Sequence, residues 1–230
     1  MKAHGLPSRD RPHDKYFKAV FSIRELALEL LEFSLPANLL EVIDKESLGL
    51  ASDSYVDEHL NETFSELVYH ARLQTEEPVK ISFLFEHKSY PPSQPVQFQL
   101  LRYILNSWES DLRQNKSPAP VISTVVYHGR KPWKKETLVE HFARFPKAIY
   151  PYIPDFEFHF VSLRNISDAV LFSMNLGLLR NVFLALKHAR DEQYLRQHFA
   201  QIVIFAEPIS QNEIVRFLFN ATLLYLKSVS

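Results

Sequence analysis

The chain has 230 residues, with 26 Lys and Arg against 27 Asp and Glu, and it contains no cysteine. This near-neutral balance excludes the overall positive field that marks many nucleic-acid binders, so any DNA binding must use a local patch. The absence of cysteine excludes disulfides and cysteinyl metal sites, and the 46% hydrophobic content is that of an ordinary globular protein.

The N-terminal residues 1–11 are polar and are predicted to form a flexible arm. They lack the apolar centre of a secretory signal, and no later stretch reaches the ~20 uninterrupted apolar residues of a membrane span. We therefore expect a cytoplasmic protein that does not enter a membrane. After this arm, apolar residues recur at helical spacing over 24–33 and predict a helix that ends before Pro36.

Two strands joined by a short turn are predicted next. In residues 58–73 apolar and polar residues alternate, and residue types that favour β-strands are frequent. Pro78 separates this segment from an apolar run that ends at Glu86. Such a pair of strands is most simply a hairpin with its turn at 75–78.

A helix and further strands follow. Breaker residues at 90–95 precede a helix expected over 96–113. Its apolar positions recur at amphipathic spacing and are Leu100, Leu101, Ile104, Leu105, Trp108 and Leu112. The β-branched run 121–129 predicts a buried strand, and 156–163 is another strand candidate. Strand, strand, helix, strand is the order of an α/β fold.

The amino-acid composition changes after about residue 167, where helix-forming apolar residues dominate. Ser210 and Glu213 have the spacing of a capping box ahead of a last helix. We expect one domain over 12–166 and a helical C-terminal region over 167–230. Its two or three helices are expected to pack on the core or on a partner, including a second copy of the chain.

The end of the second predicted strand carries a candidate for phosphodiester chemistry. Glu86 and Lys88 are two positions apart, so the two-residue period of a strand points both to one face of the sheet. A carboxylate is a hard ligand for Mg²⁺, and an adjacent ammonium can orient a water or stabilise charge on a phosphate. The alternative is an ordinary ion pair at a strand end.

Three further residues support a site at Glu86: Glu66 on the preceding strand, and Gln99 and Tyr103 on the following helix. If the two strands form a hairpin, Glu66 comes close to Glu86, and converging carboxylates repel each other unless a cation lies between them. Gln99 and Tyr103 are four residues apart and share one helix face, where they can address a phosphate or a base. The alternatives are a solvated strand residue for Glu66 and an ordinary helix surface for Gln99 and Tyr103.

Several blocks in order resemble one bacterial family. They are HDKYFKAVFS, DSYVDEHLNETFSELVY, ISFLFEHKSY, QLLRYILNSW and PVISTVVYHGRKPW. Together they closely resemble the recombination-promoting nuclease or putative transposase family, within the PD-(D/E)XK nuclease superfamily. This resemblance implies that residues 12–166 are a nuclease-like domain with a restriction-endonuclease-like α/β fold, a mixed central sheet flanked by helices.

Carried over residue by residue, the resemblance implies that Glu66 and Glu86 are metal ligands and that Lys88 is the catalytic lysine. Gln99 and Tyr103 match the Q-x-x-x-Y motif of a subset of these nucleases. The implied metal is Mg²⁺, with Mn²⁺ as a substitute, and the implied substrate is DNA. The family usually has aspartate where this chain has Glu66, and the extra methylene moves the carboxylate outward at a metal that is strict about geometry.

Three functions follow from these observations. The first is a metal-dependent DNA endonuclease that promotes recombination or acts with mobile elements. The second is a catalytically impaired nuclease-fold protein that serves as a DNA-binding or assembly module. The third is a structural partner protein that uses its C-terminal helices. An early-helix acid adds a metal contact in part of the superfamily, and Glu25 or Glu29 is the candidate here.

Overall fold

Alternating and β-branched segments of the chain form one mixed sheet in the computed structural model. It describes residues 12–51, 64–86, 95–129, 131–173, 177–204 and 212–229, with the backbone alone at 64–66 and 82–86. The strands lie side by side in chain order: β1 (Ile43–Leu50), β2 (Phe64–Leu73), β3 (Pro78–Glu86), β4 (Val121–Tyr127) and β5 (His159–Ser162). The first three are antiparallel, and β3, β4 and β5 are parallel. The predicted α/β class with a mixed sheet is confirmed.

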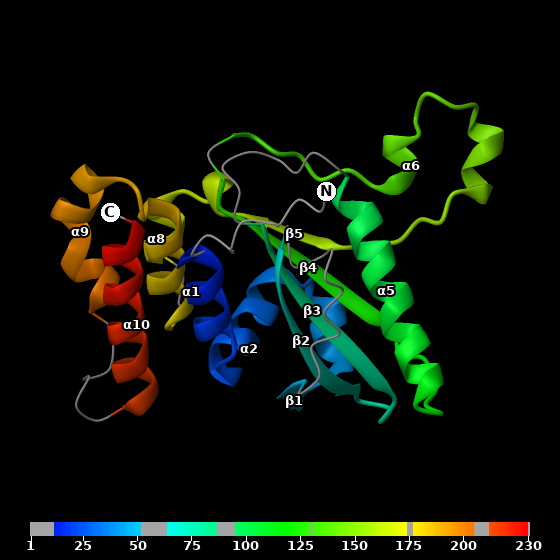
Figure 1. Ribbon diagram of the computed structural model, residues 1–230, viewed down its shortest axis with the longest axis horizontal. Helices are drawn as coiled ribbons and strands as arrows, with labels where there is room; N and C mark the ends of the chain where they lie inside the picture. Colours follow the sequence, from blue (N-terminus) through cyan, green and yellow to red (C-terminus); the bar gives the residue numbers. More distant parts are fainter. Residues whose placement is uncertain are drawn as a thin grey trace, which may run out of the picture.

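Helices cover both faces of this sheet (Figure 1). Before the hairpin these are α1 (Pro12–Phe21), α2 (Arg24–Ser34) and α3 (Ala37–Val42), and between β3 and β4 lies α5 (Val96–Arg113). Later come α6 (Leu138–His141), η1 (Lys147–Tyr152), η2 (Leu163–Asn165), α7 (Asp168–Ser173), α8 (Leu179–His188), α9 (Glu192–Val203) and α10 (Glu213–Val229). In the described ranges, each helix is too short or too polar to cross a bilayer.

The predicted hairpin is confirmed. Strands β2 and β3 pair from Phe64 opposite Glu86 to Arg72 opposite Pro78. The turn between them closes with a hydrogen bond from the Leu73 amide to the Glu77 carbonyl, 2.8 Å long. Pro78 lacks an amide donor and begins β3, where such a residue is tolerated.

The two faces of the hairpin pack differently. Odd-numbered positions such as Tyr69 and Ile81 belong to the main core beside α1 and α2. On the other face, Val68 joins a small cluster with Tyr103 of α5, and Lys80 contacts α5 through its ammonium. The chain between β3 and the parallel strand β4 therefore crosses the even-numbered face as α5.

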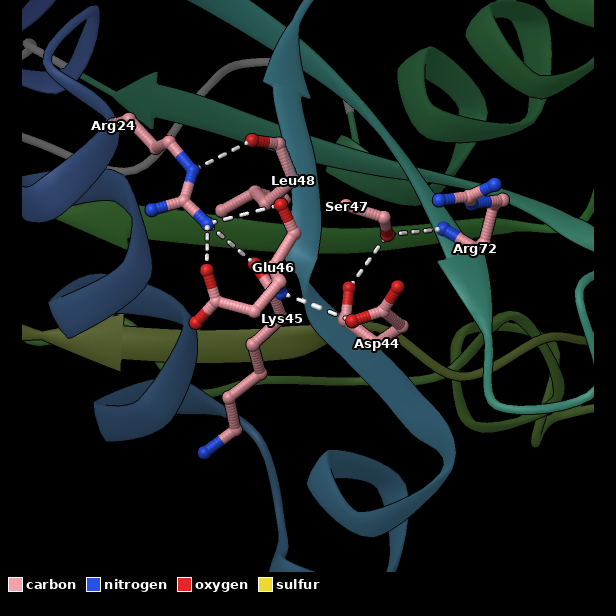
Figure 2. Close-up of polar contacts among 7 residues, drawn as sticks. All are labelled: Arg24, Asp44, Lys45, Glu46, Ser47, Leu48 and Arg72. Atoms are coloured by element: carbon pink, nitrogen blue, oxygen red, sulfur yellow. Dashed lines mark hydrogen bonds and ion pairs between the residues drawn. The ribbon is translucent and has the colours of Figure 1, made fainter.

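Strand β1 was not predicted, because its sequence IDKESLGL shows no regular alternation. Its pairing with β2 shifts register between Asp44 and Gly49, which makes a bulge at the edge of the sheet. Figure 2 shows how Arg24 of α2 holds this bulge: its guanidinium donates to the carbonyls of Leu48 and Lys45 at 2.9 Å each. A bulged and clamped edge strand is a poor template for pairing with another chain.

The C-terminal helices pack on the same core as the sheet. Buried apolar side chains from α1, α2, the sheet, α8, α9 and α10 form one continuous cluster. Between α1 and α10, the rings of Tyr16 and Tyr225 stack with centroids 4.2 Å apart, and the Tyr16 hydroxyl lies 2.8 Å from the Thr222 hydroxyl. The expectation that these helices pack on the core is confirmed.

The start of α10 differs from the predicted capping box. Ser210 lies outside the described residues, and Glu213 is the first residue of the helix. The Asn212 side chain accepts hydrogen bonds from the amides of Ile214 and Val215, at 2.9 and 3.2 Å. Asn212 therefore caps α10, as asparagine commonly does.

Helix α5 has the predicted bounds and buries only part of its predicted apolar positions. Its buried side chains are Val96, Gln97, Gln99, Leu100, Tyr103, Ile104, Ser107, Ser110 and Asp111. Of the predicted apolar positions, Leu100 and Ile104 are buried, whereas Leu105 and Leu112 are 48% and 61% exposed. The reason is an ion pair that fixes the rotation of the helix: the Lys80 ammonium is 2.7 Å from the Asp111 carboxylate and 2.8 Å from the Ser107 hydroxyl.

Candidate nuclease site

The two positions predicted to supply metal carboxylates, 66 and 86, lie at the end of the sheet where β2 begins and β3 ends. The strand register places Glu66 opposite Leu84 and Glu86 opposite Phe64. Positions 66 and 86 are therefore diagonal neighbours, the arrangement in which long side chains on adjacent strands reach each other. The side chains of both glutamates lie outside the described part of the structure, as do His87 and Lys88 entirely.

The register also fixes the face of the sheet on which these positions fall. Val68 and Lys80, which have the same parity, both contact α5. Positions 66 and 86 continue this even-numbered series toward the end of the sheet. They therefore belong to the face that α5 covers.

Helix α5 runs along this face with its N-terminal half nearest to the predicted carboxylates. Its C-terminal half is tied to the start of β3 by the Lys80–Asp111 ion pair, and Tyr103 packs in one cluster with Val68. Gln99 is one turn closer to the helix N-terminus than Tyr103, on the side of Glu86. The fold thus directs the buried side of α5, with both predicted residues, toward the end of the sheet that holds positions 66 and 86.

Both α5 residues are buried. Tyr103 is fully buried and Gln99 is 9% exposed. The Gln99 side-chain oxygen accepts no hydrogen bond from the described residues. A buried amide oxygen costs free energy unless a donor or a cation satisfies it, so Gln99 marks a place suited to a polar ligand.

The two α2 acids named as candidates for a further metal contact, Glu25 and Glu29, lie in different environments. The Glu29 carboxylate accepts hydrogen bonds from the amides of Leu178 and Leu179, at 3.2 and 2.7 Å, where α8 begins. A Cβ at Gly177 would lie 2.5 Å from the same carboxylate, so glycine permits this approach. Glu29 therefore anchors α8, whereas Glu25 is exposed on α2.

A second feature lies at the same end of the sheet. Tyr127, the last residue of β4, pairs with Glu86 of β3, and His128 follows it. His128 lines a cavity of about 600 Å³ that also involves α1, α8 and the start of α9. Its basic and imidazole side chains are His13, His128, Lys187, His188 and Arg190.

Hydrogen bonds orient two of these groups. His13 is 6% exposed, and its Nε2 accepts from the Arg190 guanidinium at 3.1 Å, because arginine only donates. The proton of the ring is then on Nδ1, which donates to the Tyr225 hydroxyl at 2.6 Å. The ring of His128 lies 4.7 Å from that of His13. Residues far apart in the sequence therefore build this cavity.

The remaining charges around the cavity balance one another. Desolvation of the Asp168 carboxyl raises its pKa, but hydrogen bonds from Lys187 and His188 outweigh this effect and lower the pKa to about 2. Ionised Asp168 therefore offsets Lys187. Asp191 caps α9 by accepting from the Tyr194 amide at 3.0 Å.

The residues at the end of β4 and just after it are held by specific contacts. A Cβ at Gly129 would collide with the Tyr127 ring, so only glycine fits there. The Tyr127 hydroxyl donates to the Lys131 carbonyl at 2.9 Å, and its ring packs edge-on against Trp133 with centroids 5.0 Å apart. These contacts fix the chain that leaves β4 beside the candidate site.

The donor set at positions 66 and 86 fits a divalent cation. Two carboxylates on diagonal strand positions offer hard oxygen ligands, and the buried Gln99 oxygen lies on the helix that covers them. Among the residues whose side chains are described, no three His, Asp or Glu groups gather as a metal site. The proposed ligands are not among those side chains.

Comparison with known proteins places this architecture in a family. The pattern of the family described as "Putative transposase, YhgA-like" matches residues 11–214. RpnA of Escherichia coli K12, named a recombination-promoting nuclease, is 29% identical over 119 residues, which are 51% of this chain and 40% of RpnA. RpnD of Escherichia coli O157:H7, named likewise, is 32% identical over 53% of this chain and 48% of its own length.

A further relative has a different name. YjiP of Escherichia coli K12, a "putative inactive recombination-promoting nuclease-like protein", is 34% identical over 40% of this chain and 87% of its own length. This chain spans less than half the length of RpnA and RpnD. No solved structure matches it. Because the family pattern covers most of the sequence, from before α1 into α10, the chain belongs to the YhgA-like putative transposase family.

Proposed function

We propose that this chain is a metal-dependent DNA endonuclease that hydrolyses phosphodiester bonds and promotes recombination or acts with mobile elements. The observation that carries the proposal is the diagonal register of positions 66 and 86 on the sheet face that α5 covers with Gln99 and Tyr103. The names of RpnA and RpnD, recombination-promoting nucleases, support the same reaction class. Glu86 is also the first residue of the Glu-x-Lys triplet Glu86-His87-Lys88 in the sequence.

Each residue has a defined role in this proposal. Glu66 and Glu86 would hold the divalent cation, Mg²⁺ or Mn²⁺, which when bound polarises a phosphate oxygen and lowers the pKa of a water. Lys88 stabilises the negative charge that develops on the phosphate and orients the attacking water. Gln99 and Tyr103 position the backbone of the substrate against the sheet.

The first test is metal binding. Titration calorimetry with Mg²⁺ and with Mn²⁺ should show one specific site in the parent chain, and Glu86→Gln should abolish the heat of binding because it removes one of two carboxylate ligands. Glu66→Asp should retain binding and tighten it, since the shorter side chain restores the distance that the family usually has. Binding that is unchanged in Glu86→Gln would contradict the assignment of this ligand.

The cavity beside His128 is proposed to hold the DNA backbone next to the cut. Arg190 is exposed to solvent and oriented by His13, and a guanidinium matches the geometry of a phosphate. Arg190→Gln should lower DNA affinity roughly tenfold at low salt and reduce the slope of log K against log salt by about one.

Fluorescence anisotropy with labelled duplex DNA in a chelator would measure this, because cleavage is then absent. Arg196→Gln is the matched control: it removes the same charge from an exposed arginine that is paired with Glu192 on α9. Equal affinities and slopes for the two variants would remove Arg190 from the DNA-binding surface.

A catalytically impaired DNA-binding or assembly module is the second candidate. Two observations favour it: Glu66 stands where the family usually has aspartate, and YjiP is named an inactive member. In that case the parent chain binds DNA but no metal, and Glu66→Asp gains metal binding. The same calorimetric experiment therefore separates the two candidates.

A further inference from the structure

The outward face of α5 carries an apolar stripe that its own chain leaves open to solvent. The stripe consists of Phe98, Leu101, Leu105, Trp108 and Leu112. Phe98, Leu105, Trp108 and Leu112 are 39, 48, 37 and 61% exposed, and Leu101 is half-buried. Contiguous exposed apolar groups of this size on a helix usually mark an interaction surface.

The spacing of the stripe is that of a helix that packs against another helix. Its members are separated by three, four, three and four residues, the pattern of the a and d positions of a heptad repeat. The side chains that α5 buries against the sheet lie on the opposite side of the helix. A second helix can therefore approach the stripe without meeting the sheet.

The N-terminal end of the stripe is partly covered within the chain. The Phe98 ring contacts the rings of His141 and Phe142 of the α6 region, with centroids 5.7 and 6.3 Å away. The open part therefore runs from Leu101 to Leu112. The Trp108 indole donates to the Ala119 carbonyl at 2.8 Å, which holds this side chain in place at the surface.

We propose that two copies of this chain associate through α5, with the two helices antiparallel and related by a twofold axis near residue 106. In this register Leu101 of each copy packs against Leu112 of the other, and Leu105 packs against Trp108. A twofold contact requires a surface that is complementary to itself, and this alternation provides one.

The charges beside the stripe select this orientation. Arg102 and Glu109 flank it on the same side, and both are exposed. In an antiparallel pair centred near residue 106, Arg102 of each copy faces Glu109 of the other, so two equivalent ion pairs form. In a parallel pair the residue facing Arg102 would be Gln97 and the residue facing Glu109 would be Ile104, and both are buried in each copy.

The contact is short, which limits its strength. Eleven steps from Leu101 to Leu112 at about 1.5 Å each give a seam of roughly 17 Å. One helix pair of this length makes a small interface, so we expect a reversible dimer in the micromolar range rather than a permanent one. The pairing does not require that the chain cuts DNA, so it stands or falls apart from the proposed function.

Sedimentation velocity over a range of micromolar concentrations tests the proposal on the full chain. The parent should shift from monomer to dimer with concentration, and Leu105→Glu should remain a monomer throughout because it places a charge in the seam. Leu224→Glu is the matched control, since Leu224 is 70% exposed on α10 and outside the stripe. Circular dichroism melting of each variant confirms that the fold is retained.

A charge exchange tests the orientation. Arg102→Glu and Glu109→Arg should each weaken the dimer about tenfold, because each brings like charges together at two symmetric places. The double variant should restore it, since the ion pairs re-form with reversed sign. A parent that stays monomeric, or a dimer lost in Leu224→Glu and kept in Leu105→Glu, would overturn the proposal. Failure of the double variant to recover would overturn the antiparallel register.

Discussion

Replacing Lys88 with alanine should lower the rate of DNA cleavage by about a hundredfold or more, while DNA affinity in a chelator changes little. The ammonium at this position is proposed to stabilise charge that exists only in the transition state, so its loss slows the chemical step more than binding. Nicking of supercoiled plasmid under single-turnover conditions measures the rate directly.

Lys116→Ala provides the matched control for that experiment. Lys116 is an exposed lysine after α5 that hydrogen-bonds Gln114 at 2.8 Å and lies at the other end of the helix from Gln99. Its loss removes the same charge from the chain and should leave the cleavage rate unchanged. Equal rates for Lys88→Ala and the parent would remove Lys88 from the catalytic step.

Replacing Lys80 with methionine should destabilise the fold by about 3–5 kcal/mol, the largest stability effect that we expect from a single change. The variant keeps the length of the side chain but leaves the Asp111 carboxylate buried without its cation. Both side chains are less than a tenth exposed, so solvent cannot take over the role of the ammonium. Equilibrium urea unfolding gives the free energy of unfolding for parent and variant.

The double variant Lys80→Met, Asp111→Leu separates the cost of an unpaired charge from the worth of the pair. It should recover much of the lost free energy of unfolding, because two apolar side chains replace the ion pair, although the Ala119 amide loses its acceptor on Asp111. A loss below about 1 kcal/mol for Lys80→Met alone would mean that the ion pair does not fix α5 on the sheet.

The parts of the fold that follow from local pattern were predictable. The hairpin is set by alternation and Pro78, and the bounds of α5 are set by the breaker residues around it. Strand β1 was missed because it is a half-polar edge strand whose bulge is held by Arg24, a residue of α2. No pattern within the strand itself reports that contact.

The apolar positions of α5 were predicted, but not which of them the helix buries. Apolar periodicity favoured the stripe through Leu105 and Leu112, whereas the helix buries Ser107 and Asp111 because Lys80 reaches them from β3. An ion pair across thirty-one positions outweighs local hydrophobicity here. The apolar stripe on the outer side of α5 is thereby left at the surface.

Part of the candidate site could be predicted from the sequence and part could not. The four-residue spacing of Gln99 and Tyr103 predicted that they share a helix face, and both are buried on the side of α5 that faces the sheet. The cavity formed by His13, His128 and Arg190 could not be foreseen from spacing, because packing of α1 with α8 and α10 brings these residues together. The only signal was that His13 and His128 stand within the resembling blocks.

The measurement that tests the central claim most directly is nicking of supercoiled plasmid by the purified parent chain with Mg²⁺, with Mn²⁺ and with a chelator, beside Glu66→Asp. We predict cleavage that requires the metal, disappears in the chelator and continues in Glu66→Asp. Cleavage by Glu66→Asp but none by the parent would contradict the proposed endonuclease and identify a chain whose remaining function is binding.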